Sequence, residues 1–218
     1  MKRILILWLL LFSLLYGQRP QWGSGVTQGH LNALKKDFVV DTITYNIPYY
    51  DDLRFPVTGI NPPGAASDPT RETTYGTLTF SPSATNMIAI VAQLPHGYKQ
   101  GTDLEAHVHW AKTTSAAGAV YWQLDYRWAR IGETMDGSWT TVSSTTPSVS
   151  DDNTAEQHAI TAFTTIDGSA AQISDILVMQ LSRIGGNAAD TYGAAARLLE
   201  IDIHYRIDRP GSTQEFIK

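Results

Sequence analysis

Apolar and polar residues alternate along much of the chain from about residue 38 onward. In residues 122–128 every second side chain is large and apolar, and the side chains between them are polar. A β-strand places successive side chains on opposite faces, so this pattern predicts a strand with one buried face and one wet face. Residues 199–206 alternate in the same way, with Glu200, Asp202, His204 and Arg206 on the polar face. The residues predicted to face the core are Trp122, Leu124, Tyr126, Trp128, Leu199, Ile201 and Ile203.

Nine β-rich runs recur between turn signals, and no long helical pattern separates them. The runs are FVVDTITYNI, DDLRFP, YGTLTF, MIAIVAQLP, LEAHVHWAK, AVYWQLDYRWARI, EQHAITAFTTI, ISDILVMQLSRI and RLLEIDIHYRID. Strands of this number joined by long irregular connections fit two packed sheets better than a closed up-and-down barrel. We therefore predict an all-β fold, an antiparallel β-sandwich of jelly-roll type with long loops, over residues 38–218.

The connections between these runs are long and rich in Pro, Gly, Thr and Ala. The segment FPVTGINPPGAASDPTRETT holds four prolines and cannot form a central strand. The segments GETMDGSWTTVSSTTPSVSDDNTA and IGGNAADTYGAAA are also expected to be loops. Loops of this length in a compact domain commonly serve as functional surfaces or subunit contacts.

The N-terminal residues 1–17 have the order of a secretory signal peptide. Two positive charges precede an apolar run from Ile4 to Tyr16, and cleavage is expected near Gly17. The run is too short for a good transmembrane helix. An uncleaved anchor and a buried N-terminal helix are the alternatives. Residues 18–37 are predicted to be a leader with a short helical segment beginning at Leu31.

Composition excludes several classes of protein. The net charge is −5 and no basic run exceeds a pair, so the sequence predicts no nucleic-acid partner. With no cysteine, disulfide scaffolds, thiolate zinc sites and cysteine nucleophiles are excluded. Hydrophobic content of 43% with a mean hydropathy of −0.17 argues against a disordered chain or a multispanning membrane protein.

His107 and His109 are the most suggestive pair for chemistry. Two residues apart in a strand, their imidazoles share one face about 7 Å apart at the Cα level, a spacing that suits one metal ion. The spacing from Gly101 through both histidines resembles the opening of the cupin metal motif, but the later Glu of that motif is missing. His204 can be a third ligand only if its strand pairs beside His107.

Two other readings of this pair stay open. The His-x-His spacing is similar to that of trimeric phage spikes, which bind a metal on a three-fold axis. Alternatively, His107 and His109 are structural and are held by hydrogen bonds to neighbouring polar groups, with Val108 and Trp110 both on the opposite, buried face. The expectation from sequence is no bound cofactor, with His107, His109 and His204 as the candidate metal ligands.

No catalytic motif stands out, so the sequence predicts no enzyme. G-x-S-x-G, H-E-x-x-H, a P-loop and a strand-linked G-x-G-x-x-G are all missing. The acidic pairs at 51–52 and 151–152 fit solvated turns better than calcium loops. The aromatics Tyr49, Tyr50, Trp139 and Tyr192 are candidates for stacking on sugars, although most aromatics of an all-β protein are core.

Three strings, LPHGYK, HVHW and DIHYRID, together with YWQLDYRWARIGE and the terminal EFIK, carry a family resemblance. From about Tyr50 to Lys218 the chain resembles a family of uncharacterised proteins of tailed phages and prophages, described at best as virion structural, head- or tail-associated. The resemblance implies a non-enzymatic virion protein that binds itself, as a homotrimer or another closed oligomer, and other virion proteins. It supplies no catalytic residue. The signal-like N-terminus favours the alternative, a secreted or periplasmic carbohydrate-binding or cupin-like metal-binding protein with a surface glycan as partner.

Overall fold

The computed structural model describes residues 49–143 and 154–215, which belong to one compact unit, Thr44–Lys218. The predictions for residues 1–17, 18–37 and the run FVVDTITYNI lie outside the described residues. Within them, the only helical element is a single 3₁₀ turn, η1 Val57–Gly59. No helix in these ranges is long and apolar enough to cross a membrane.

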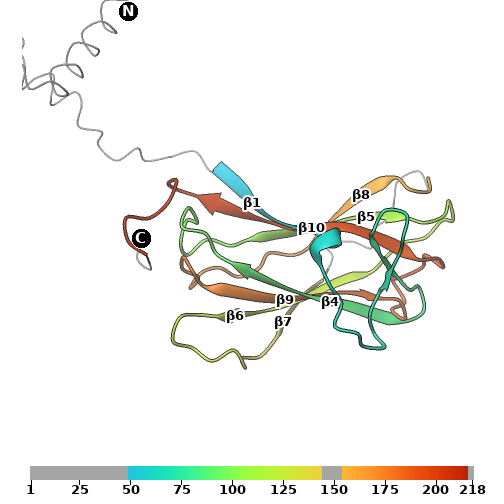
Figure 1. Ribbon diagram of the computed structural model, residues 1–218, viewed down its shortest axis with the longest axis horizontal. Coiled ribbons are helices and arrows are strands. Elements are labelled where there is room, and N and C mark those ends of the chain that lie inside the picture. The colour runs from blue at the N-terminus through green and yellow to red at the C-terminus, as the bar shows by residue number, and fades with distance from the viewer. Residues whose placement is uncertain (1–48, 144–153, 216–218) are drawn as a thin grey trace, which may run out of the picture. The chain divides into compact units, whose positions relative to one another are not determined.

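Two antiparallel sheets pack face to face, with β1, β10, β5 and β8 in one layer and β4, β9, β6 and β7 in the other (Figure 1). The predicted antiparallel β-sandwich of jelly-roll type is therefore confirmed. The strands are β1 Tyr49–Pro56, β2 Thr70–Arg71, β3 Leu78–Phe80, β4 Thr85–Gln93, β5 Glu105–Lys112, β6 Trp122–Ala129, β7 Thr140–Ser143, β8 His158–Ala162, β9 Ile176–Ile184 and β10 Ala196–Ile207.

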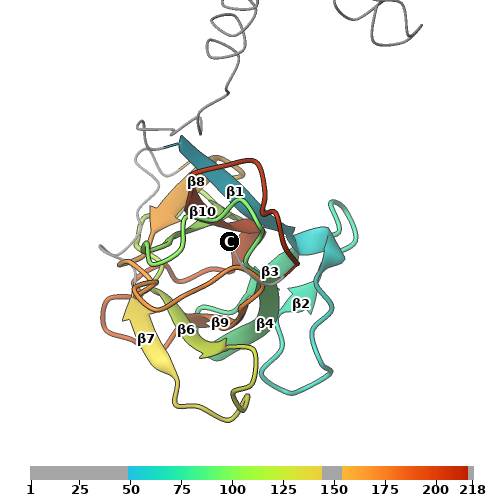
Figure 2. The same ribbon diagram turned by 90° about the vertical axis from the view of Figure 1, so that its left-hand side faces the viewer.

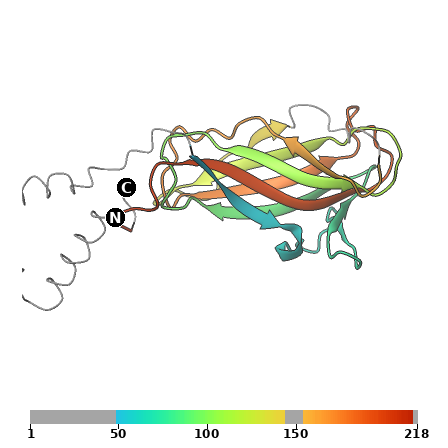
Figure 3. The same cartoon turned by 90° about the horizontal axis from the view of Figure 1, so that it is seen from above.

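Strand β10 organises the six-stranded sheet. One of its edges pairs with β5, which in turn pairs with β8, and its other edge pairs with β3 and then with β1. Figure 3 looks onto this sheet, with β10 in red between β1 and β5. The end view in Figure 2 shows β2 and β3 at the side of the sandwich. The second sheet has the order β4-β9-β6-β7.

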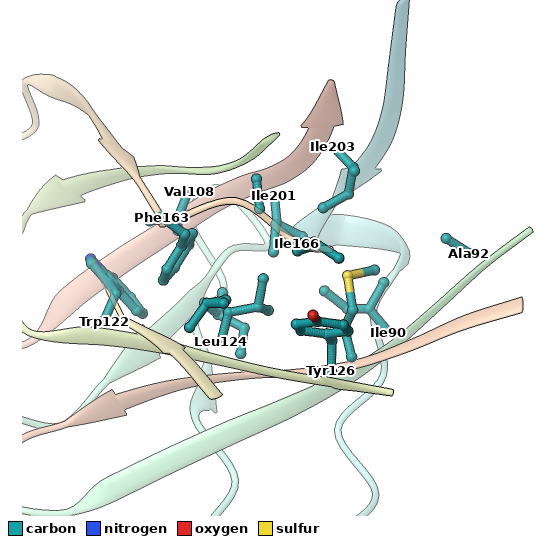
Figure 4. Packing of buried hydrophobic residues seen from close by; sticks show 14 of the residues in the cluster. Ile90, Ala92, Val108, Trp122, Leu124, Tyr126, Phe163, Ile166, Ile201 and Ile203 are labelled. Atoms are coloured by element: carbon teal, nitrogen blue, oxygen red, sulfur yellow. The ribbon is translucent and has the colours of Figure 1, made fainter. Parts of the chain in front are cut away.

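The core lies between the sheets and is built from the inward faces of both (Figure 4). Val108 and Ile201 from one sheet and Leu124 from the other are fully buried, and Tyr126 is 5% exposed. Burial of apolar area is the main favourable contribution to the stability of such a sandwich. The alternation seen in residues 122–126 thus marks the face that makes the core.

Two predicted core residues behave differently. Trp128 is only partly buried and packs against the rim of the core. Leu199 was predicted to face the core, and this prediction is wrong. The pairing of β10 with β5 shifts register between Leu198 and Glu200, so one residue is inserted there as a β-bulge. The bulge reverses the phase of the strand: Leu198 is buried and Leu199 lies on the outer face.

Two short strands form inside segments that the sequence assigned to loops. β2 lies in the proline-rich segment and β7 in the Thr/Ser-rich one, and each sits at the edge of its sheet. Edge positions tolerate neighbouring prolines because one side of the strand needs no ladder partner.

The Gly/Ala-rich connection between β9 and β10 is anchored by the fully buried Arg183. Its guanidinium donates two hydrogen bonds to the Asp190 carboxylate, at 2.8 and 2.7 Å. Its other donors reach the carbonyl oxygens of Phe80, Tyr192 and Ala194. The planar fork of arginine suits this geometry. The pair therefore ties the connection to the end of β3.

Candidate functional site

Histidines and carboxylates gather on the outer face of the six-stranded sheet. Because Ile201, Ile203 and Tyr205 of β10 point into the core, the side chains between them point outward. Neighbouring strands present outward groups at the same level, since Asp202 pairs with His107 and His204 pairs with Asp52 in the register. We call the resulting group the histidine cluster; it consists of Asp52, His107, His109, His158, Asp202 and His204.

The Asp202 carboxylate is at the centre of the histidine cluster. Its Oδ2 lies 3.3 Å from His109 Nε2 and 3.4 Å from His204 Nε2. Its Oδ1 lies 3.8 Å from His107 Nδ1 and accepts no hydrogen bond from the described residues. Asp202 is only 7% exposed, so water covers little of this carboxylate. Three imidazoles thus surround one buried carboxylate group.

His109 and His158 form a hydrogen-bonded pair. His109 Nδ1 lies 2.8 Å from His158 Nε2, and the two rings stack with centroids 5.0 Å apart. If His109 Nε2 donates to Asp202, neutral His109 has an unprotonated Nδ1 that accepts from His158. A chain of hydrogen bonds then runs from the exposed His158 to Asp202 and fixes the His109 tautomer.

His107 and His204 meet edge to face, with ring centroids 4.5 Å apart. Burial lowers the pKa of His107, and the neighbouring His204 lowers it further, while Asp202 and Glu105 act in the opposite direction. His107 is therefore biased toward the neutral form, which has a free nitrogen lone pair. One ligand atom each from His107, Asp202 and His204 lies within 4.8 Å of the others.

A hollow of about 450 Å³ adjoins the histidine cluster on the same face. Arg54 and Glu200 close one side of it with two hydrogen bonds of 2.7 and 2.8 Å between guanidinium and carboxylate. The hydrogen bond to Glu200 raises the pKa of Arg54. The bulge of β10 adds Leu199 to the lining. The full lining is Asp52, Arg54, His109, His158, Leu199, Glu200 and Asp202.

The structure brings together all three histidines named from the sequence. His204 was expected to be a third ligand only if its strand lies beside that of His107, and β10 does pair directly with β5. The expected arrangement of Val108 and Trp110 is confirmed, since both are fully buried while His107 and His109 lie on the other face. His158 and Asp52 were not singled out from sequence as partners of this site. The alternation of polar and apolar residues around His158 and Asp52 predicts that both side chains point outward. It does not predict that their strands lie beside β5 and β10.

Of the aromatics considered for sugar stacking, Tyr49, Tyr50 and Trp139 are exposed. Tyr192 is fully buried, so the prediction that it offers a stacking surface is wrong. Its hydroxyl contacts Thr114, and its ring lies under Lys112 and Arg183. Tyr50 shares the outer face of β1 with Asp52 and Arg54, and its ring lies 5.6 Å from the Arg206 guanidinium.

No protein-family model matches the chain, and no curated protein matches it. Among solved structures, it is similar to a xylan-binding module, CBM15, at 12% identity over 74% of this chain and 100% of that one, with a TM-score of 0.41. It is similar to CBM35 from Cellvibrio japonicus Abf62 at 12% identity over 77% and 99%, with a TM-score of 0.36. A desmodium yellow mottle tymovirus chain matches at 12% identity over 78% and 93%, with a TM-score of 0.21. No function follows from likenesses at this distance.

Proposed function

We propose that this chain is a non-enzymatic binding module that takes a carbohydrate in the hollow on the outer face of the six-stranded sheet. The observation that carries the proposal is the lining of the hollow, in which six of the seven residues are polar. Its volume falls within the usual range of small-ligand sites. The carboxylates and imidazoles of the lining supply hydrogen-bond acceptors and donors that suit sugar hydroxyl groups.

An exposed aromatic ring, that of Tyr50, lies on the same face of β1 as Asp52 and Arg54, which line the hollow. Tyr50 is 43% exposed, and Arg206 donates a 3.1 Å hydrogen bond to its hydroxyl. This contact orients the ring at little entropic cost, because a tyrosine has few rotatable bonds. In the register Tyr50 pairs with Arg206 and Pro56 with Glu200, so an oligosaccharide of several units held at Glu200 and Arg54 would be needed to reach this ring.

Within the described part of the chain, one serine hydroxyl that lies against a histidine is poorly arranged for nucleophilic catalysis. Ser212 Oγ lies 2.5 Å from His96 Nδ1, and it donates its own proton to the carbonyl oxygen of Gln214. His96 Nδ1 must then be the donor in the contact, so it cannot remove the serine proton.

The test is a glycan array probed with the full chain, followed by calorimetry with the oligosaccharides that bind, in buffer containing EDTA. The Glu200→Ala and Tyr50→Ala variants should each lose at least about tenfold in affinity, which corresponds to about 1.4 kcal/mol of binding free energy. Tyr75→Ala is the matched control, because Tyr75 is also exposed and lies 5.1 Å from an arginine, Arg197, on another part of the surface. An array without any bound glycan, or equal losses in all three variants, would overturn the proposal.

A second candidate is the virion structural module that the sequence resemblance implies. The three strings that carry the resemblance are contiguous in space: Lys99 N donates to Arg206 O at 2.7 Å, Tyr98 bridges to Ile207, and His107 pairs with Asp202. The residues that carry the resemblance are therefore neighbours in the fold, and their outward-facing members could contact other copies of the chain or other virion proteins.

Light scattering and mass spectrometry of purified particles test this second candidate. A homotrimer would scatter as three times 24.0 kDa, and the protein would be found in the particles. A monomer at high concentration that is missing from the particles would overturn the candidate. The same spectra would separate a virion location from a secreted or periplasmic one by reading the N-terminus.

A further inference from the structure

We propose that His107, His204 and Asp202 bind a divalent transition-metal ion of the zinc class on the outer face of the six-stranded sheet. The proposal concerns the histidine cluster itself and does not depend on which ligand occupies the hollow. It is the one group of three potential metal ligands of this kind within residues 49–143 and 154–215.

The spacing of the three groups is close to what such an ion requires. Ligand atoms about 2.0–2.2 Å from a tetrahedral zinc ion lie roughly 3.3–3.6 Å from one another. His204 Nε2 is 3.4 Å from one oxygen of Asp202, and His107 Nδ1 is 3.8 Å from the other. All three ligand atoms fall within 4.8 Å. The separations of the three ligand atoms are therefore near those that one ion requires.

One of the two oxygens of the Asp202 carboxylate has no hydrogen-bond partner among the described residues. Its Oδ1 is buried and accepts no hydrogen bond from the described residues, and a buried anion of this kind is costly unless a cation or donors compensate it. Arg54, the cation on the neighbouring strand, directs Nε and Nη2 to Glu200 instead. A metal ion between the imidazoles would supply the missing positive charge.

The surrounding groups support the three ligands. His109 Nε2 approaches Asp202 Oδ2 at 3.3 Å and is itself held by His158. Asp52 Oδ1 lies 3.2 Å from His204 Nε2, the same nitrogen that approaches Asp202, so a second carboxylate stands beside the ligand set. Carboxylates and imidazoles in such positions orient metal ligands and increase their basicity. The cluster thus has both a first set of ligands and the groups that hold them.

The ligand types select the metal. Two imidazoles and one carboxylate suit zinc, nickel, cobalt and copper, whereas calcium and magnesium prefer sites made entirely of oxygen. Three protein ligands leave a coordination position for water or for a group from another molecule. The site lies on a solvent-facing surface, so that position is accessible from outside the sandwich.

The test is calorimetric titration of the EDTA-treated and dialysed full chain with Zn²⁺ and Co²⁺, with Mg²⁺ for comparison. We expect one Zn²⁺ or Co²⁺ per chain, visible absorption from bound Co²⁺, no comparable binding of Mg²⁺, and a rise in Tm with saturating Zn²⁺. His204→Ala and Asp202→Asn should each weaken binding at least about tenfold and reduce the Tm rise. Asp202→Asn preserves the shape of the side chain, so it separates lost binding from lost folding.

The matched control is His96→Ala, which removes an imidazole from the connection between β4 and β5, outside the histidine cluster, and should bind Zn²⁺ as the unaltered chain does. Three results would overturn the proposal: no stoichiometric binding, unchanged affinity in both cluster variants, or an equal loss in His96→Ala. The last result would indicate adventitious binding by surface histidines. Because the glycan test uses EDTA, failure of the metal site and failure of carbohydrate binding are distinguishable.

Discussion

The indole rings of Trp110 and Trp122 meet edge to face between the two sheets, with centroids 6.2 Å apart. Both side chains are fully buried. Trp110 donates its Nε1 hydrogen to Thr161 Oγ1 at 2.9 Å, whereas Trp122 Nε1 has no acceptor among the described residues. Two neighbouring tryptophans in one core therefore differ in whether their polar atom is satisfied.

The two tryptophans should respond differently to the same substitution. Trp110→Phe removes a made hydrogen bond, and Trp122→Phe removes a buried donor that lacks a partner. We expect Trp110→Phe to cost about 1–2 kcal/mol more in the free energy of unfolding, since both changes lose a similar apolar area. Urea denaturation of the two variants measures the difference. If Trp122→Phe lost as much free energy of unfolding as Trp110→Phe, or more, Trp122 Nε1 would have to have a hydrogen-bond partner.

The buried pair of Arg183 and Asp190 should be important for stability. Asp190→Ala leaves the Arg183 guanidinium buried without its charge partner, and the expected loss is about 3–5 kcal/mol. Glu133→Ala is the control, because it breaks the more exposed pair with Arg130, and it should change the stability much less. Urea midpoints that fall by the same small amount in both variants would be inconsistent with this assignment.

Gly168 is predicted to tolerate no side chain. A Cβ atom at this position would lie 2.0 Å from the Thr102 carbonyl oxygen, so Gly168→Ala must push two backbone segments apart. We expect a loss of about 1–3 kcal/mol. At Gly186 a Cβ atom would meet nothing within 4 Å, and Gly186→Ala should be close to neutral. Thermal unfolding of the two alanine variants and the unaltered chain measures both changes. Equal Tm values for the two variants would contradict the prediction.

Acid should weaken the fold through His107. Its pKa is lowered in the folded protein, first by burial and then by His204, against an unfolded value of about 6.5. The unfolded chain therefore binds the proton more readily. The stability associated with neutral His107 is complete above about pH 6.5 and is lost as the pH falls through that value toward the lower folded pKa. Metal-free protein should thus show lower urea midpoints near about pH 5.5 than at neutral pH.

His107→Gln isolates this contribution, because glutamine does not titrate. Its urea midpoint should depend less on pH over the same range, with EDTA present throughout. If the urea midpoint of His107→Gln depended on pH as strongly as that of the unaltered chain, another group would be responsible for the acid sensitivity.

Strict alternation allowed the fold class and much of the core to be predicted. Trp122, Leu124 and Tyr126 lie on one face because their strand has no irregularity. In such a strand every second side chain points into the core, so the sequence pattern predicts burial directly. Leu199 was misassigned because a bulge adds one residue without any local sequence signal. The strands β2 and β7 were missed because their stability comes from pairing with a neighbour, and their own residues resemble those of a loop.

The candidate site was only partly visible in the sequence. His107 and His109 share a face by spacing alone. The approach of His204 and Asp202 to these histidines depends on the pairing of β5 with β10, which are separated along the chain by residues 113–195. His158 enters only because β8 pairs with the far edge of β5. Long-range strand order is not encoded in local periodicity, and this limits how much of such a site can be predicted.

The central position of β10 has a consequence for how the protein is made. β1 pairs with β10 alone, and β3 and β5 also need β10 to join their sheet. During translation these earlier strands leave the ribosome with their partner still to be synthesised. Non-local pairing of this kind folds slowly and exposes strand edges to other chains in the meantime. The six-stranded sheet, and with it the histidine cluster, can therefore assemble only after residue 207 has emerged.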